Sequence, residues 1–248
     1  MPAVYDEIGQ SYVVTRQPDT RIAQAIRAAL GAARTVLNVG AGTGSYEPAD
    51  LQVVAVEPSR AMIQQRPAWT APIVQAVAEY LPWSDAAFDA TLAILTIHHW
   101  HDRAAGLAEL RRVARHRVVL LTWDPACRDA FWLTTRYVPE ILDLDVPRFP
   151  SMAELSRCLG QIEARPLPIP HDCQDGFLGA FWRRPAAYLD PTVRRAMSGF
   201  AQLPPEVVNA GLAHLAEDLR SGQWDAQFGW VREQTSLDLG YRLIIALL

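Results

Sequence analysis

A glycine-rich segment near residue 40 is the part of the sequence best suited to hold a ligand with its backbone. Gly40, Gly42 and Gly44 directly follow the apolar run 36–39. Glycine permits positive φ and has no Cβ atom, so such a turn lets the chain approach a ligand closely at the carboxyl end of a strand. A dinucleotide-binding fingerprint would have a third glycine where this chain has Ser45. The turn therefore favours a nucleoside cofactor that lacks a pyrophosphate.

Two further segments have residue types that would bind such a nucleoside. Glu57 ends the next apolar run, 17 residues after Gly40, and its carboxylate can accept hydrogen bonds from both hydroxyls of a ribose. Ala78 and Glu79 follow the third apolar run, in a short polar loop that could contact the edge of an adenine ring. Glu57 could instead be a solvated carboxylate at the start of a helix.

Histidines gather at the end of the fourth apolar run. His98, His99, His101 and Asp102 are near neighbours in the sequence, but ligands so close together seldom complete a tetrahedral metal shell. We therefore expect no metal site. An unperturbed histidine titrates near neutral pH, so one of these side chains could act as a general base or orient a substrate. His99 is the candidate, and packing at the strand end would explain it equally well.

The spacing of apolar residues predicts the elements that would bring these groups together. Short apolar runs alternate with amphipathic stretches between residues 34 and 123, which is typical of a parallel sheet covered by helices on both faces. Strands are expected at 35–39, 53–56, 73–77, 90–97, 118–122, 163–170 and 241–248. Helices are expected to begin after Asp19 and Ser59, and another to span 103–114. The fold class is therefore α/β and Rossmann-like, with a mostly parallel seven-stranded sheet.

The segments around these residues resemble the class I S-adenosylmethionine-dependent methyltransferases, most nearly the group typified by ubiquinone and menaquinone C-methyltransferases. The resemblance rests on the run 36–44, on Glu57, on the loop at 78–79, on the segment 95–100 and on the segment 109–113. It covers roughly the first half of the chain with good specificity and the second half only loosely. It implies S-adenosylmethionine as cofactor and S-adenosylhomocysteine as product.

The same resemblance implies which residues contact the cofactor. In that family the glycine-rich turn binds the methionine part, the acid after the second strand binds the ribose, and an arginine of an N-terminal lid can meet the cofactor carboxylate. The expected cofactor contacts are Tyr5, Tyr12, Arg16, Asn38, Gly40, Ala41, Gly42, Gly44, Glu57, Pro58, Met62, Ala78, Glu79 and Leu95. Asn38 departs from the family, which usually has an aspartate there, and an amide supplies a weaker field for the ammonium group of the cofactor.

The second half of the chain is expected to supply the site for a small-molecule methyl acceptor. After Trp123 the regular alternation stops, and aromatic residues and prolines become frequent. Aromatic walls exclude water and tolerate a positive charge. The candidate acceptor residues are Trp123, Phe131, Trp132, Tyr137, Phe177 and Trp182. These aromatic side chains could equally be simple core.

A long insertion before the last strand completes the expected architecture. It is too long for an ordinary connection, and its apolar residues recur at helical spacing, which predicts a folded cap. Within it, Asp172 and Asp175 could belong to a loop over the acceptor pocket or could be turn formers. The expected units are a lid with the first helix at 1–33, a cofactor-binding core at 34–170, a helical insertion at 171–239 and a final core strand at 240–248.

Charge and hydropathy limit the partners and the location. The net charge of −4 gives no basic surface for a nucleic acid. The start of the chain lacks the apolar run of a signal peptide and the apolar end is too short to span a bilayer, so we predict a cytoplasmic protein without membrane contact, as a monomer or homodimer. Two alternatives remain: a nicotinamide-dependent oxidoreductase on the same fold, and a protein that binds S-adenosylmethionine without transferring its methyl group.

Overall fold

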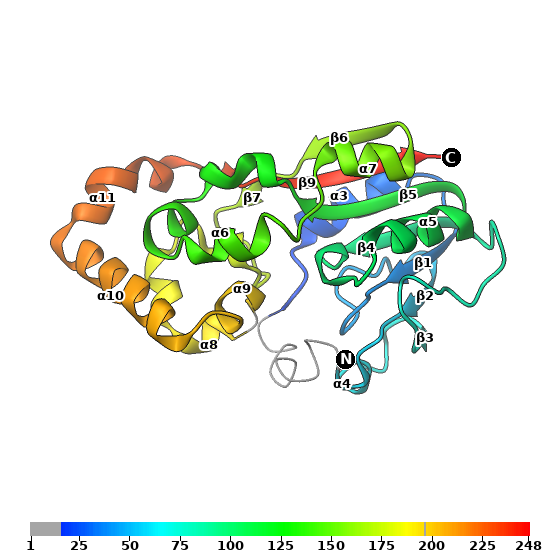
Figure 1. Cartoon of the computed structure of the whole chain (residues 1–248), viewed down its shortest axis with the longest axis horizontal. Coiled ribbons are helices and arrows are strands. Elements are labelled where there is room, and N and C mark those ends of the chain that lie inside the picture. The colour runs from blue at the N-terminus through cyan, green and yellow to red at the C-terminus, as the bar shows by residue number, and fades with distance from the viewer. Residues whose placement is uncertain (1–15, 196) are drawn as a thin grey trace.

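Seven strands form the central sheet of the computed structural model, which describes residues 16–195 and 197–248 (Figure 1). The strands lie in the order β3-β2-β1-β4-β5-β9-β6. They are β1 (Thr35–Val39), β2 (Gln52–Val56), β3 (Ile73–Val74), β4 (Phe88–Ile94), β5 (Ala114–Trp123), β6 (Ile162–Pro166) and β9 (Tyr241–Leu247). The pairs among β1 to β5 are parallel, whereas β9 runs antiparallel to both β5 and β6. The predicted α/β fold with a mostly parallel seven-stranded sheet is confirmed.

Helices cover both faces of this sheet. They are α3 (Thr20–Leu30), α4 (Arg60–Gln64), α5 (Arg103–Val113) and α7 (Met152–Leu159). Helix α3 packs in the same apolar cluster as Val36 and Leu92, whereas α5 and α7 pack in a second cluster with Leu37. The side chains of Asp19 and Ser59 each accept a backbone N–H of the following turn, so α3 and α4 begin where the sequence predicts.

A helical lobe lies beside the sheet, beyond the carboxyl end of β5 (Figure 1). It combines two stretches of chain, residues 125–150 and 167–240. The first stretch holds η3 (Pro125–Ala130), η4 (Leu133–Tyr137) and α6 (Glu140–Asp145). The second holds η5 (Leu178–Phe181), η6 (Pro185–Leu189), α8 (Pro191–Arg194), α9 (Ser198–Ala201), α10 (Pro205–Ser221), α11 (Gln223–Phe228), η7 (Gly229–Glu233) and the ladder of β7 (Ile169–Pro170) with β8 (Ser236–Leu237).

The lobe extends beyond the insertion predicted at 171–239, because the chain after β5 packs with it. The hydroxyl of Tyr137 donates a hydrogen bond of 2.8 Å to Asp218 of α10. A Cβ atom on Gly211, also in α10, would lie 2.2 Å from the carbonyl oxygen of Tyr137, so the two stretches approach as closely as a glycine allows. Residues 125–150, which the sequence places in the core, are therefore part of the lobe.

Three predicted strands are shorter or divided in the structure. Strand β3 has two residues only. Strand β4 ends at Ile94 because Leu95 has a positive φ of 48°, and residues 97–99 form the short helix η2 (Ile97–His99). The strand expected at 163–170 divides into β6, which pairs with β9, and β7, which pairs with β8 in a separate ladder.

Trp132 and Trp182 form part of the interior of the lobe. Trp182 is fully buried. Its indole N–H donates to the carbonyl oxygen of Ile169 at 2.9 Å, and the indole N–H of Trp132 donates to the carbonyl oxygen of Trp182 at 2.8 Å. Both indoles are thus paired polar groups inside an aromatic core, which also holds Tyr188 and Trp224.

We expect Trp182→Ala to lower the free energy of unfolding by about 3–5 kcal/mol, the range for removing a buried aromatic side chain. Trp230→Ala is the matched control, because Trp230 is 56% exposed and surface changes stay within about 0.5 kcal/mol. Urea unfolding followed by circular dichroism measures both variants. Equal stability of Trp182→Ala and the unaltered protein would contradict the packing described.

Candidate active site

A large cavity opens at the carboxyl ends of β1, β2 and β4, where the sequence predicts a nucleoside. Its volume is about 700 Å³, a size suited to a cofactor. The predicted contacts that line it are Arg16, Asn38, Gly40, Ala41, Gly42, Glu57, Pro58, Met62, Ala78, Glu79 and Leu95. Lining residues that were not among the expected cofactor contacts include Thr43, Tyr46, Thr96 and Trp100. Tyr5 and Tyr12 lie outside the described residues, and Gly44 supports the turn from behind.

The glycine-rich turn is held tightly on its outer side and open toward the cavity. Gly40 has a φ of 69°, and a Cβ atom there would lie 2.1 Å from Oγ1 of Thr96. At Gly44 a Cβ atom would lie 2.6 Å from the side chain of Thr70. Gly42 lines the cavity and has a φ of 52°. The turn therefore presents bare backbone to a ligand, which is the cradle that a methionine moiety requires.

Glu57 lies at the end of β2 with its carboxylate directed at the backbone of the neighbouring turns. Oε2 accepts the N–H of Gly42 at 2.8 Å, and Oε1 accepts the N–H of Ser59 at 3.0 Å. A carboxylate has about two acceptor directions on each oxygen, which suits it to accept the two hydroxyls of a ribose. The residues present thus fit a nucleoside cofactor.

A buried ion pair behind the turn explains the asparagine at position 38. Arg66 donates to Glu47 at 2.8 Å and to the carbonyl oxygen of Gly42 at 3.1 Å, and the two charged side chains are 4% and 6% exposed. The amide of Asn38 donates to Glu47 at 3.3 Å. An aspartate at position 38 would instead face the carboxylate of Glu47, and like charges at that distance repel. Glu47 and Arg66 belong to no motif, so the sequence offered no signal for them.

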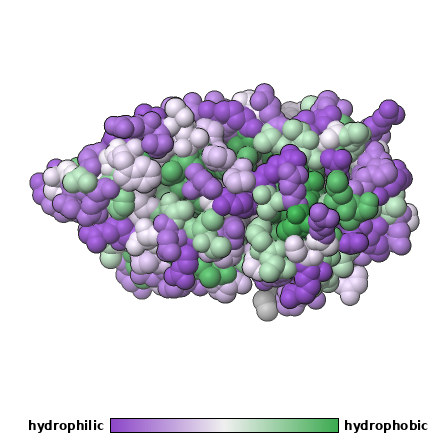
Figure 2. Space-filling model, turned by 90° about the horizontal axis from the view of Figure 1, so that it is seen from above, coloured by the Kyte–Doolittle hydropathy of each residue, from purple (hydrophilic) through white to green (hydrophobic). Residues whose placement is uncertain are grey.

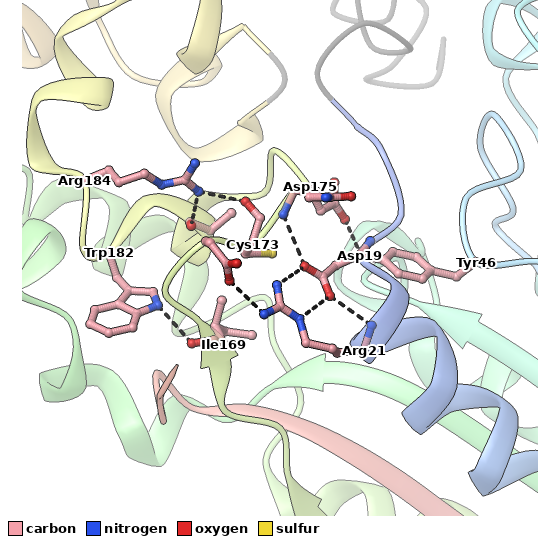
Figure 3. A network of polar contacts seen from close by, with 11 residues as sticks. Asp19, Arg21, Tyr46, Ile169, Cys173, Asp175, Trp182 and Arg184 are labelled. Carbon is pink, nitrogen blue, oxygen red and sulfur yellow. Dashed lines mark hydrogen bonds and ion pairs between the residues drawn. The ribbon is translucent and has the colours of Figure 1, made fainter. Parts of the chain in front are cut away.

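A second buried network joins the glycine-rich turn to the helical lobe (Figure 3). Asp175 is fully buried; it accepts Nε of Arg16 at 2.6 Å and the hydroxyl of Tyr46 at 2.8 Å. Burial and the charge of Asp175 raise the pKa of Tyr46 well above its usual range. Nearby, Asp19 accepts the backbone N–H of Gln174 at 3.2 Å. The loop that holds Asp175 is therefore clamped to the start of α3 and to the turn.

A smaller cavity of about 90 Å³ lies beside the large one, and Arg16 and Leu95 line both. Its aromatic walls are Trp123, Phe131, Phe149, Phe177 and Tyr241. Of the predicted acceptor residues, Trp123, Phe131 and Phe177 are among its lining residues. Trp132, Tyr137 and Trp182 are not, because hydrogen bonds and packing hold them in the core of the lobe. Phe149 and Tyr241 were missed, since nothing in their sequence context separates them from core aromatics.

The two adjacent histidines divide between the cavities. His98 lines the small cavity and His99 the large one, with their ring centroids 3.8 Å apart. Burial lowers the pKa of His98 well below its usual range, an effect increased by His99 and the arginines Arg148 and Arg103. Burial, with Arg148, lowers the pKa of His99 to about 4. Both rings are neutral at pH 7 and do not repel a cationic ligand.

Comparison with known proteins defines the class of this chain. A family model described as a methyltransferase domain matches residues 37–122. A solved structure from Anabaena variabilis, described as a candidate methyltransferase from an antibiotic biosynthesis pathway, is 35% identical with a TM-score of 0.87, over 94% of this chain and 99% of that one. The chain therefore belongs to the class I S-adenosylmethionine-dependent methyltransferases, whose cofactor is S-adenosylmethionine. The nicotinamide alternative is not supported.

More distant similarities show the fold alone. The YcgJ protein of Bacillus subtilis is 18% identical with a TM-score of 0.58, over 92% of this chain and 98% of that one. The [4+2]-cyclase SpnF is 14% identical with a TM-score of 0.52, over 98% and 93%. Among curated proteins, the uncharacterized YafE of Escherichia coli is 40% identical over 50 residues, which span 20% of this chain and 24% of that protein.

The neutral state of His99 gives the stability of the protein a predictable pH dependence. The pKa of His99 falls from 6.5 to about 4 on folding, so between these values the unfolded chain binds a proton that the folded chain does not. Above pH 6.5 His99 is neutral in both states and does not change the free energy of unfolding. As the pH falls from 6.5 toward 4, protonation of His99 in the unfolded chain lowers the free energy of unfolding. We expect His99 to account for about 1–2 kcal/mol of lost unfolding free energy between pH 7.5 and pH 5.

His99→Asn should remove that part of the acid sensitivity, as measured by urea unfolding at both pH values. His116→Asn serves as the control, because His116 is an exposed residue of β5. An unchanged acid sensitivity in His99→Asn would show that the folded protein accepts a proton at this position.

Proposed function

We propose that this protein transfers the methyl group of S-adenosylmethionine to a small molecule that binds in the aromatic cavity. The observation that supports this most is the contact between the two cavities, which share Arg16 and Leu95. An acceptor in the small cavity would thus lie next to a cofactor in the large one. Such alignment, together with exclusion of water, is what methyl transfer from an already activated sulfonium needs from a protein.

The cofactor would be held by groups that already surround the large cavity. Glu57 would accept the ribose hydroxyls, and the loop at Ala78 and Glu79 would contact the adenine edge. The carboxylate of Glu79 accepts the N–H of Asp102 at 3.0 Å, so this loop is tied to the start of α5. When bound, the cofactor supplies a methyl group on a positively charged sulfur. His99, which we keep as a candidate catalytic residue, would lie near that sulfur as a neutral ring.

The subgroup, the partners and the assembly of the protein remain predictions. The likeness to ubiquinone and menaquinone C-methyltransferases concerns the cofactor half, whereas the lobe supplies most of the acceptor cavity. In the described part of the chain no helix is long and apolar enough to cross a membrane. Figure 2 shows hydrophilic side chains over both halves of one face, with an apolar area on the half that holds the sheet. We keep a monomer or homodimer, cytoplasmic and without nucleic acid, as the expectation.

Labelled S-adenosylmethionine tests the proposed function directly. The purified protein, incubated with the label and the small-molecule fraction of a source-cell extract, should produce a labelled compound of low mass together with S-adenosylhomocysteine. A variant with Gly42→Val, which puts a branched side chain against Met62 at a φ of 52° in the glycine-rich turn, is the negative control, once its circular dichroism spectrum shows that it is folded. Tight binding of S-adenosylmethionine without any labelled product would favour the non-methylating alternative.

We expect Glu57→Gln to weaken S-adenosylmethionine binding by about 1.5–3 kcal/mol, because a hydrogen bond to a charged acceptor is lost. This corresponds to a dissociation constant raised about 10- to 150-fold. The amide oxygen can accept only one of the two backbone N–H groups that Glu57 holds, and its NH₂ group would face the other, so an unchanged circular dichroism spectrum is required before the affinities are compared. Calorimetry measures the affinity, with Glu163→Gln on exposed β6 as control. An unchanged affinity would contradict the ribose assignment.

Phe177→Leu should impair methyl transfer and leave the cofactor in place. Phe177 lines only the small cavity, so we expect a higher KM for the acceptor and an S-adenosylmethionine affinity within about threefold, which is under 1 kcal/mol. Phe228→Leu, in the lobe core away from the cavity, is the matched control. A parallel loss of both properties in Phe177→Leu would mean that this ring mainly supports the core.

A further inference from the structure

The chain turns sharply after β4, where the two cavities adjoin. Leu95, which lines both cavities, has a positive φ of 48°, a conformation that residues with a side chain rarely adopt. The short helix η2 follows this turn, and its His98 lines the small cavity whereas its His99 lines the large one. His98 therefore belongs to the part of the small cavity that adjoins the cofactor site.

The imidazole ring of His98 is held by neighbouring rings but has no hydrogen bond in the described part of the chain. The ring of Phe149 stacks on it, with the centroids 4.0 Å apart and an angle of 19° between the planes, and the ring of His99 lies 3.8 Å away. Nδ1 of His98 is enclosed by protein and has no hydrogen-bond partner. The residue still has accessible surface, so Nε2 is the ring nitrogen left to meet a ligand in the small cavity.

Most other uncharged polar side chains of the small cavity already have partners within the protein. The indole N–H of Trp123 donates to a backbone carbonyl oxygen at 2.9 Å, and the hydroxyl of Thr134 donates to another at 3.2 Å. The hydroxyl of Tyr241 accepts a backbone N–H at 3.2 Å. The side chain of Ser198, like that of His98, has no hydrogen bond among the described residues. Ser198 begins α9, however, whose residues 198–201 do not line the large cavity, so His98 is the better placed of the two to meet the reacting end of an acceptor.

The size and charge of the small cavity limit the class of acceptor. A volume of about 90 Å³ holds roughly six to nine water-sized groups, which corresponds to one ring with a substituent. Among the described residues that line it, Arg16 and Arg128 are basic and none is acidic. The bound cofactor would add a positive sulfur, so a cationic acceptor is disfavoured. An uncharged, ring-sized molecule satisfies both limits.

A hydroxyl group is the substituent that best matches His98. Burial, together with His99, Arg148 and Arg103, lowers the pKa of His98 well below its usual range, so the ring is neutral at pH 7. A neutral imidazole has one donor nitrogen and one acceptor nitrogen. A hydroxyl group both donates and accepts, and it can therefore pair with Nε2 whichever nitrogen carries the proton. A methyl group of similar size can do neither, and an aliphatic amine would be cationic.

We propose that His98 selects the methyl acceptor by a hydrogen bond between Nε2 and a hydroxyl group of an uncharged, ring-sized molecule in the small cavity. This assignment rests on the proposed function. The stacking on Phe149 fixes the direction of the hydrogen bond. Because the neighbouring His99 lines the cofactor cavity, the hydrogen-bonded end of the acceptor lies beside that cavity. His98 is thus a specificity-determining residue that the sequence analysis did not separate from the other histidines.

Phenol and toluene test the proposal, because they are similar in size and only phenol has a hydroxyl group. Calorimetry measures the Kd of each compound for the complex of the protein with S-adenosylhomocysteine. His98→Phe keeps a ring that can stack on Phe149 and removes both nitrogens. It should raise the ratio of the Kd for phenol to the Kd for toluene about 2- to 12-fold, the range for one net hydrogen bond.

Three further substitutions separate the hydrogen bond from packing. His98→Gln has an amide that can reach the position of Nε2 and should keep the ratio within about twofold of the unaltered protein. His98→Asn reaches only as far as Nδ1 and should raise the ratio as His98→Phe does. Ser198→Ala is the matched control and should leave the ratio unchanged. Circular dichroism checks the fold of each variant, and if His98→Phe does not fold, the contrast between His98→Gln and His98→Asn decides.

The proposal is overturned if phenol does not bind, if His98→Phe weakens phenol and toluene equally, or if Ser198→Ala changes the ratio in place of the His98 variants. These measurements of binding do not depend on methyl transfer. A labelled product from the cell extract without the expected ratios would therefore support the proposed function and overturn only the role of His98. The expected ratios without a labelled product would support the role of His98 in binding and favour the non-methylating alternative.

Discussion

The buried carboxylate of Asp175 is the contact on which the arrangement of this protein depends. A charge that is removed from water is tolerated only when its hydrogen-bonding capacity is filled by partners. Here Arg16, Tyr46 and the N–H of Gly176 supply those partners. They come from the chain before α3, from the end of the glycine-rich turn and from the lobe. Satisfying one carboxylate therefore fixes three segments relative to one another, and it places Arg16 at the junction of the two cavities.

Other charged and titratable groups near the two cavities are also paired or neutral. Around the large cavity, Glu47 and Arg66 are paired, and the adjacent histidines are held neutral by burial. A cationic cofactor thus meets aromatic and backbone groups, with little uncompensated positive charge close to its sulfur.

Local sequence patterns predicted the elements whose conformation depends mainly on residues close together in the sequence. The bounds of β1, the helix starts after Asp19 and Ser59, and the positive φ values of the turn follow from periodicity, capping and glycine chemistry. The helical insertion after residue 171 was predicted from its apolar spacing, whereas the part of the lobe at 125–150 was not, because its short 3₁₀ and π segments have no strong period. Which aromatic rings line a cavity depends on contacts between distant segments. For that reason Phe149 was missed, while Trp132 was assigned to a pocket that it does not line.

The position of β9 has a consequence for how the chain reaches this structure. Strand β9 lies between β5 and β6 and is the last strand in the sequence. During synthesis both neighbours therefore remain unpaired on that side until residues 241–247 have been made, which leaves the backbone N–H and C=O groups along that edge of β5 without strand partners while the second half of the chain is synthesised. Pairings of such long sequence separation form slowly and favour aggregation meanwhile. The strands around the large cavity can pair before β9 is made, whereas the part of the small-cavity wall that Tyr241 contributes cannot form until β9 is in place.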